Sequence, residues 1–109
     1  MLADMTFRGI DVSEAMENYA AKYLTKFKKY FGKLDPESIF VHVIFDGDMN
    51  HHQFSCQVRI KTAQFDLVVK KEGPEMYPII DDAMHVMEQE LQKSKQRVVD
   101  DTRKKKKCC

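Results

Sequence analysis

The sequence predicts an α+β fold, a two-layer sandwich in the order β-α-β-β-β-α, with a four-stranded, mostly antiparallel sheet and two helices on one face. Two segments, residues 16–31 and 76–91, have the apolar spacing of amphipathic helices. Four short segments are rich in β-branched and aromatic residues and alternate in polarity, as half-buried strands do. A sheet with one dry face and helices with one apolar face bury each other as two layers.

The first strand is predicted at residues 5–10, where apolar and polar residues alternate. A helix follows, because Ser13 can cap its first turn and Glu14 and Glu17 suit the positive end of the helix dipole. Apolar residues then recur at positions 16, 19, 20, 23, 24, 27 and 31. We expect Gly32 to end this helix.

A turn that contains Pro36 precedes three further strands, predicted at residues 38–45, 54–61 and 64–70. The middle strand of these three alternates strictly between apolar and polar residues, so one face of the sheet is expected to be wet. Cys56 lies on the apolar side of this strand and is expected to be a buried, small hydrophobic residue.

The last helix is predicted to begin near residues 75–78, after Gly73 and Pro74 end the strand before it. A proline is tolerated in a first helical turn, where its missing N–H has no partner. The apolar stripe of this helix comprises positions 76, 80, 83, 84, 87 and 91. We assign residues 1–99 to a single domain and residues 100–109 to a basic C-terminal tail that is expected to be disordered.

Charge is unevenly distributed, although the net charge is only +1. Residues 1–99 hold 13 Lys or Arg and 15 Asp or Glu, so binding of nucleic acid by this part requires a segregated basic patch. The first helix offers one: its lysines lie in a stripe about 60° wide, roughly 130° from the apolar stripe. These are Lys22, Lys26, Lys29 and Lys33. They fit either a ridge that binds phosphates or a solvated helix face.

A second basic segment lies late in the last helix, at Lys93, Lys95 and Arg97. Residues 103–107 add a basic run in the tail. Acidic residues occupy the earlier half of the same helix, so only its C-terminal half is electropositive. Two basic segments favour RNA as the partner, although the run in the tail also suits non-specific electrostatic binding.

No constellation of catalytic or metal-binding residues is visible, so we predict a non-enzymatic protein without a metal or a cofactor. His51 and His52 have no partner at a metal-ligand spacing and suit a solvated turn. His42 and His85 are paired with no serine or cysteine by any known motif.

Neither a secretory signal nor an apolar run of roughly 20 residues is present, which predicts a cytoplasmic protein. The odd count of 3 cysteines does not suit a disulfide framework. Cys108 and Cys109 follow a polybasic run, and this combination leaves open an alternative function, a membrane-peripheral adaptor anchored by a lipidated tail.

Three passages resemble the bacterial ribosome hibernation promoting factors and ribosome-associated inhibitors, also called sigma-modulation proteins. They are residues 12–15 leading to 25–31 (Thr25 to Phe31), residues 75–77 with Ile80 and Asp81, and residues 91–95. The likeness covers residues 5 to 97 in the same order of elements, and the length is that of a short form of the family.

The resemblance implies a fold similar to the double-stranded-RNA-binding domain and a monomer that binds small-subunit rRNA in the decoding region. There it blocks the sites of messenger RNA and transfer RNA in the stress response of stationary phase, without catalysis. Lys26, Lys93, Lys95 and Arg97 match positions that are basic in the family, whereas the other lysines of the first helix join by geometry. Whether such a protein promotes ribosome dimers or blocks single ribosomes stays open. A second alternative function, a generic double-stranded-RNA-binding module without preference for the ribosome, also stays open.

The chain also departs from the family's pattern. Val86 and Gln89 stand where relatives often carry basic residues, so the last helix is expected to be less electropositive than in those proteins.

Overall fold

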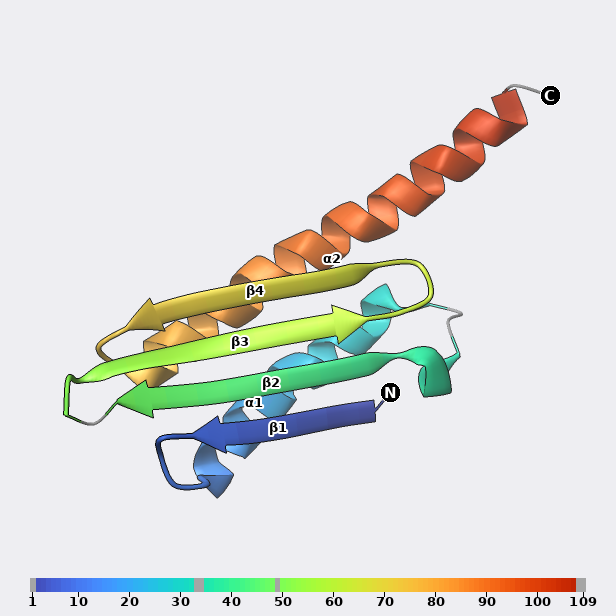
Figure 1. The fold of residues 1–109 in the computed structure, drawn as a ribbon. Helices are drawn as coiled ribbons and strands as arrows, with labels where there is room; N and C mark the ends of the chain where they lie inside the picture. The colour runs from blue at the N-terminus through green and yellow to red at the C-terminus, as the bar shows by residue number, and fades with distance from the viewer. Residues whose placement is uncertain (1, 33–34, 49, 108–109) are drawn as a thin grey trace.

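The structure, a computed structural model, describes residues 2–32, 35–48 and 50–107, with side-chain detail up to residue 94 except at Pro36. Its elements follow the predicted order (Figure 1). They are β1 (Leu2–Arg8), α1 (Glu14–Phe27), the 3-10 turns η1 (Lys28–Tyr30) and η2 (Pro36–Ser38), β2 (Phe40–Asp48), β3 (Gln53–Lys61), β4 (Asp66–Gly73) and α2 (Met76–Lys107).

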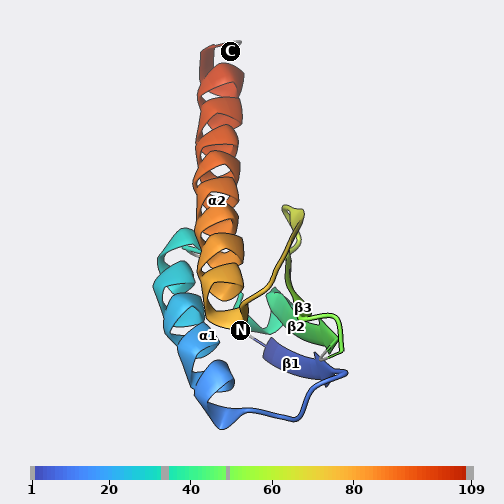
Figure 2. The same ribbon diagram turned by 90° about the vertical axis from the view of Figure 1, so that its left-hand side faces the viewer.

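The four strands form one sheet in the order β1-β2-β3-β4. β1 pairs with β2 in parallel, while the pairs β2–β3 and β3–β4 are antiparallel. A parallel pair needs a crossover connection, and α1 supplies it. Both helices cover the same face of the sheet and run in the same direction (Figure 2), so the predicted α+β architecture is confirmed.

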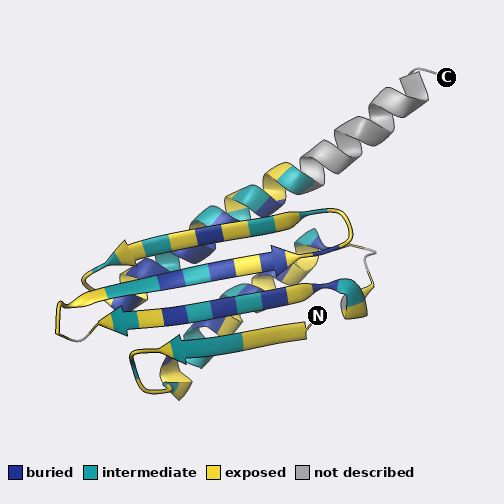
Figure 3. Ribbon diagram, in the orientation of Figure 1, coloured by how far each residue is buried: buried dark blue, intermediate teal, exposed yellow. Residues whose placement is uncertain are grey.

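The core lies between the sheet and the helices. Alternate residues of the central strands point into it and are fully buried, among them Val43, Phe45, Val58 and Ile60 (Figure 3). The helices contribute their predicted apolar stripes to the core. Every residue of the α2 stripe is buried: Met76, Ile80, Ala83, Met84, Met87 and Leu91. Cys56 is also buried, as its place in the alternating strand predicted.

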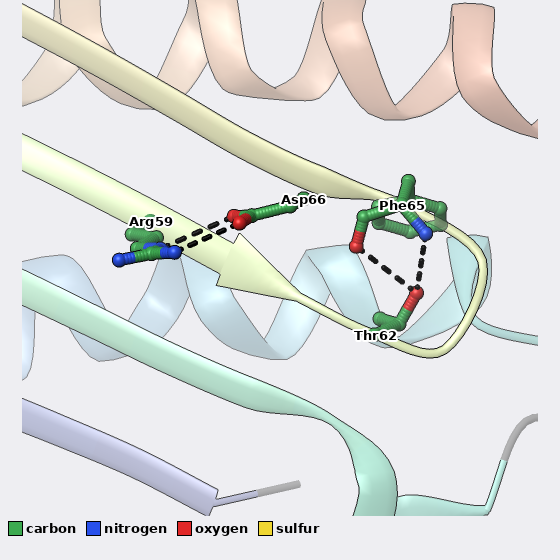
Figure 4. A network of polar contacts seen from close by, with 4 residues as sticks. All are labelled: Arg59, Thr62, Phe65 and Asp66. Atoms are coloured by element: carbon green, nitrogen blue, oxygen red, sulfur yellow. Dashed lines mark hydrogen bonds and ion pairs between the residues drawn. The ribbon is translucent and has the colours of Figure 1, made fainter.

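The strand boundaries differ from the predicted ones by a few residues. β1 spans 2–8 instead of 5–10, because it pairs from Leu2↔Phe40 onward and Gly9, with φ +70°, turns the chain away. β4 begins at Asp66 because the turn before it is closed by Thr62, whose N–H donates to the Phe65 carbonyl at 2.8 Å. The Thr62 hydroxyl also accepts from the Phe65 N–H at 3.1 Å (Figure 4).

The two ends of α1 were predicted with unequal success. The Ser13 hydroxyl accepts a hydrogen bond from the Met16 N–H at 3.2 Å, so this residue is the N-cap as expected. The regular helix ends at Phe27 rather than Gly32, and the chain tightens into η1 before Gly32 turns it with φ +55°. A 3-10 turn at a helix C-terminus is a common way to use the last carbonyl groups.

α2 is longer than expected. Its helix continues through residues 100–107, where the sequence predicts a disordered tail. No glycine or proline interrupts residues 79–107, so the backbone meets no local helix breaker there. Cys108 and Cys109, on which the membrane-anchor alternative depends, lie outside the described residues.

No helix in the described part of the chain is both long enough and apolar enough to span a bilayer.

Candidate nucleic-acid interface

The basic face of α1 is present and open to solvent. Lys22 and Lys26 are exposed on α1, and Lys29 is exposed on η1. Side chains three residues apart eclipse in a 3-10 turn, so the tightening after Phe27 keeps Lys29 in line with Lys26. Lys33, the fourth predicted member, lies outside the described residues. Three of the four lysines therefore share one side of the molecule.

Tyrosines lie between these lysines and the core, where α1 and η1 meet α2. The hydroxyls of Tyr19 and Tyr23 both donate to Asp81 Oδ1, at 2.6 and 2.5 Å. About two turns onward, the Tyr30 hydroxyl donates to Glu88 Oε1 at 2.8 Å. We call this boundary the polar seam; it comprises Tyr19, Tyr23 and Tyr30 together with Asp81, Glu88 and Gln92.

The hydrogen bonds of the seam change the acidity of the phenols. Two causes raise the pKa of Tyr23 well above its ordinary value: donation to the Asp81 carboxylate is the larger and burial is the smaller. The pKa of Tyr19 is raised for the same reasons. The two phenols therefore ionise only at a higher pH than an unperturbed tyrosine does.

The seam also contacts the lysines. Lys29 Nζ lies 3.8 Å from Glu88 Oε1 and 5.0 Å from the centroid of the Tyr30 ring. Lys26 Nζ lies 5.4 Å from the centroid of the Tyr23 ring, within cation–π range. Sequence reasoning missed these tyrosines as site residues, although their spacing of three from Lys22 and Lys26 was a usable signal.

The basic residues of α2 lie elsewhere. Gln92 donates to the Tyr30 hydroxyl at 3.0 Å, so it faces the seam. Lys93 is one residue further, about 100° around the helix, and it lies 3.6 Å from Glu90. One flank of α2 faces the seam and the α1 lysines, and the structure places Lys93 on a different flank. The side chains of Lys95 and Arg97 lie outside the described residues.

The open face of the sheet has a different character, with charges of both signs in pairs. Arg59 Nε and Nη2 donate to the Asp66 carboxylate at 3.1 and 2.8 Å (Figure 4). Lys70 Nζ lies 3.4 Å from Glu72 Oε1. Phe40 and two other large apolar residues, Leu2 and Val68, are exposed. Ion pairs also occur among the helix lysines, but the Arg59–Asp66 pair is bidentate and occupies the guanidinium of the open face. This face is therefore the poorer candidate for RNA.

The histidines and Cys56 form no reactive site among the described residues. No three His, Cys, Asp or Glu side chains of the described part of the chain could hold a metal ion together. His51 Nδ1 lies 2.6 Å from Asp48 Oδ2 in an exposed turn, and His42 Nε2 lies 2.9 Å from the Thr6 hydroxyl. Burial raises the pKa of the Cys56 thiol to about 12, so it is a poor nucleophile.

Comparison with known proteins places this geometry in a family. A family model described as "Sigma 54 modulation protein / S30EA ribosomal protein" matches residues 3–99. No curated protein sequence matches the chain.

Two solved structures are similar over nearly the whole domain. A ribosomal subunit interface protein from Coxiella burnetii is 25% identical with a TM-score of 0.70, covering 88% of this chain and 99% of that chain. The N-terminal domain of Protein Y from Thermus thermophilus is 16% identical with a TM-score of 0.72, covering 85% and 98%. The family match covers α1, β2, β3 and β4 in full, nearly all of β1, and α2 up to residue 99, so this chain belongs to the Sigma 54 modulation protein / S30EA ribosomal protein family of ribosome-associated proteins.

Proposed function

We propose that this protein silences translation by binding the small ribosomal subunit. It occupies rRNA of the decoding region, where messenger RNA and transfer RNA would otherwise bind. The observation that carries the proposal is the row of exposed lysines Lys22, Lys26 and Lys29 in a chain whose residues 3–99 match this family. The likeness to a ribosomal subunit interface protein supports the same assignment.

The chemistry required is binding without a reaction. Each lysine ammonium neutralises a phosphate and releases condensed counterions, which gives affinity that falls steeply with salt. Phosphate contacts set the position of the protein on the RNA, and the volume of the folded domain then excludes competing ligands. The protein acts as a cytoplasmic monomer in this proposal, induced under stress or in stationary phase, and it needs no cofactor.

Lys93, Lys95 and Arg97 are proposed as a second group of phosphate contacts. Lys93 lies on another flank of α2 than the seam, so the two groups would bind separate stretches of rRNA rather than one. A protein held by two separated contacts is fixed in orientation as well as in position.

Co-sedimentation with small subunits over a series of salt concentrations tests the proposal. We expect saturable binding near one copy per subunit, and we expect Lys26→Glu with Lys93→Glu to abolish it. The matched control is Lys61→Glu with Lys70→Glu, which makes the same charge change at exposed positions of the open sheet face.

The control pair should bind like the wild type. Both lysines of the test pair are exposed, so thermal unfolding should be nearly unchanged in both double variants. Equal loss of binding in both pairs would indicate an effect of net charge alone. If the Lys26→Glu, Lys93→Glu variant still binds small subunits, the basic residues of the two helices are not the rRNA-binding site.

A further inference from the structure

Tyr77 is an exposed aromatic residue, and the lysine–phosphate contacts of the proposed function give it no role. It lies in the first turn of α2 with 43% of its surface exposed, and it belongs to the few large apolar residues that the described fold leaves in water. Its ring meets that of Tyr19 edge to face, at 5.1 Å between centroids and 89° between planes. The Tyr19 ring meets that of Tyr23 in the same manner, at 6.0 Å and 70°. We call Tyr77, Tyr19 and Tyr23 the aromatic row.

The aromatic row is held in place before any ligand binds. Tyr19 and Tyr23 both donate to Asp81 Oδ1, which anchors the two rings of α1 to α2. Tyr77 then rests against an anchored ring. Side chains that are already ordered lose little conformational entropy on binding, so such a row is a favourable platform for a flat ligand.

Cations accompany the rings along α1. Lys22 follows Tyr19 by three residues and Lys26 follows Tyr23 by three, so each ammonium neighbours a ring on the helix surface. The distance of 5.4 Å from Lys26 Nζ to the Tyr23 centroid demonstrates this for one pair. Alternating rings and ammoniums are what an RNA strand with free bases requires, since bases stack on aromatic rings and phosphates bind cations.

Paired RNA fits this surface less well. A double-stranded helix shields the faces of its bases and is recognised through phosphates and shape over about 16 base pairs. Such a duplex needs a broad cationic surface. Here the Asp81 and Glu88 carboxylates lie in the seam beside the lysines, and Lys93 lies on another flank of α2.

We propose that the aromatic row is a binding site for unpaired RNA nucleotides, with a base stacked on Tyr77 and neighbouring phosphates on Lys22 and Lys26. This inference rests on the proposed function and makes it more specific, because it selects unpaired rRNA segments over helical ones as the ligand of this surface.

The test compares two RNA probes with the full chain at matched salt: a single strand of about ten nucleotides and a blunt duplex of about 16 base pairs. The wild type should prefer the single strand. Tyr77→Ala and Tyr77→Leu should each weaken single-strand binding about tenfold, because one stacked base is lost. Tyr77→Phe should bind normally, since its ring is kept.

Phe40→Ala is the matched control, an aromatic residue of similar exposure, 51%, on the opposite face. It should leave binding unchanged. The chain has 4 Tyr and 0 Trp, so tyrosine emission has no tryptophan background. The single strand should quench this emission less in Tyr77→Leu than in the wild type, and the difference assigns the quenching to Tyr77. Leucine keeps an apolar contact with Tyr19, so this variant tests stacking even where alanine unfolds the protein.

Equal affinity for both probes, or unchanged binding in Tyr77→Leu, would overturn the inference. The proposed function is tested separately by small subunits: if the wild type binds subunits while Tyr77 variants bind the single strand normally, only the aromatic row is wrong. Single-strand binding that depends on Tyr77 without any binding to subunits would keep the row and reject the ribosomal target.

Discussion

The connection between β1 and α1 depends on a glycine that no other residue can replace cheaply. Gly9 has φ +70°, and a Cβ atom built on it would lie 2.2 Å from the Gly47 carbonyl oxygen of β2. Gly32 provides a matched comparison, because it has φ +55° with nothing within 4 Å of a Cβ atom. Alanine at either position must adopt the left-handed backbone conformation, which lowers the free energy of unfolding by about 1 kcal/mol. Only Gly9→Ala must also displace β1 from its neighbour.

That displacement sets the expected difference. Relieving the contact requires the edge strand to move by roughly 1 Å, and overpacking of this kind costs about 1–3 kcal/mol. We therefore expect Gly32→Ala to lower the free energy of unfolding by about 1 kcal/mol and Gly9→Ala by about 3 kcal/mol. The melting temperatures of the two variants should differ by about 10 °C.

Urea unfolding followed by circular dichroism measures both variants under identical conditions. Equal losses would refute the reasoning, because they would mean that the backbone conformation alone matters and that the Gly47 carbonyl yields without cost. A larger loss in Gly32→Ala would contradict it as well.

Further predictions concern single side chains. Ser13→Ala removes the N-cap hydroxyl of α1 and should lower the free energy of unfolding by about 1 kcal/mol in urea, whereas an unchanged midpoint would show that the cap is dispensable. Glu88→Gln removes a carboxylate 3.8 Å from an ammonium of η1 and should raise the affinity for small subunits about twofold to fivefold, while Glu72→Gln on the open face should not. The Cys56 thiol, whose pKa burial raises to about 12, should resist Ellman's reagent until denaturant is added; rapid reaction in the native state would contradict its burial. The pKa of Tyr23 is raised from 10.0 in the folded state, so the hydrogen bond from Tyr23 to Asp81 should stabilise the fold fully below pH 10. This stabilisation should be lost as pH rises toward the folded-state pKa, and ultraviolet titration of the tyrosines should reveal a phenol that ionises above pH 10.

The order of elements and the faces that they bury follow from the sequence alone. Amphipathic helices and half-buried strands have periods of 3.6 and 2 residues, and these patterns are local. They correctly predicted the apolar stripe of α2 and the burial of Cys56, while the capping preference of serine correctly predicted the N-cap at Ser13. The exposure of Lys22 and Lys26 followed from the same periodicity.

Strand ends and the end of α1 were predicted less well. β1 begins at Leu2 because Phe40 lies opposite it, and a partner 38 positions away leaves no mark on the local pattern. The switch to a 3-10 turn after Phe27 likewise depends on how that segment packs on α2, which contacts η1.

The polar seam was decided by tertiary structure only. Tyr19 meets Asp81 across 62 positions, and Tyr30 meets Glu88 across 58. Whether a helical tyrosine reaches a carboxylate, and whether lysines of two helices share a side, depends on how α1 and α2 lie beside each other on the sheet. Periodicity fixes the direction of a side chain about its own helix axis, but the relative placement of two helices comes from packing over the whole core.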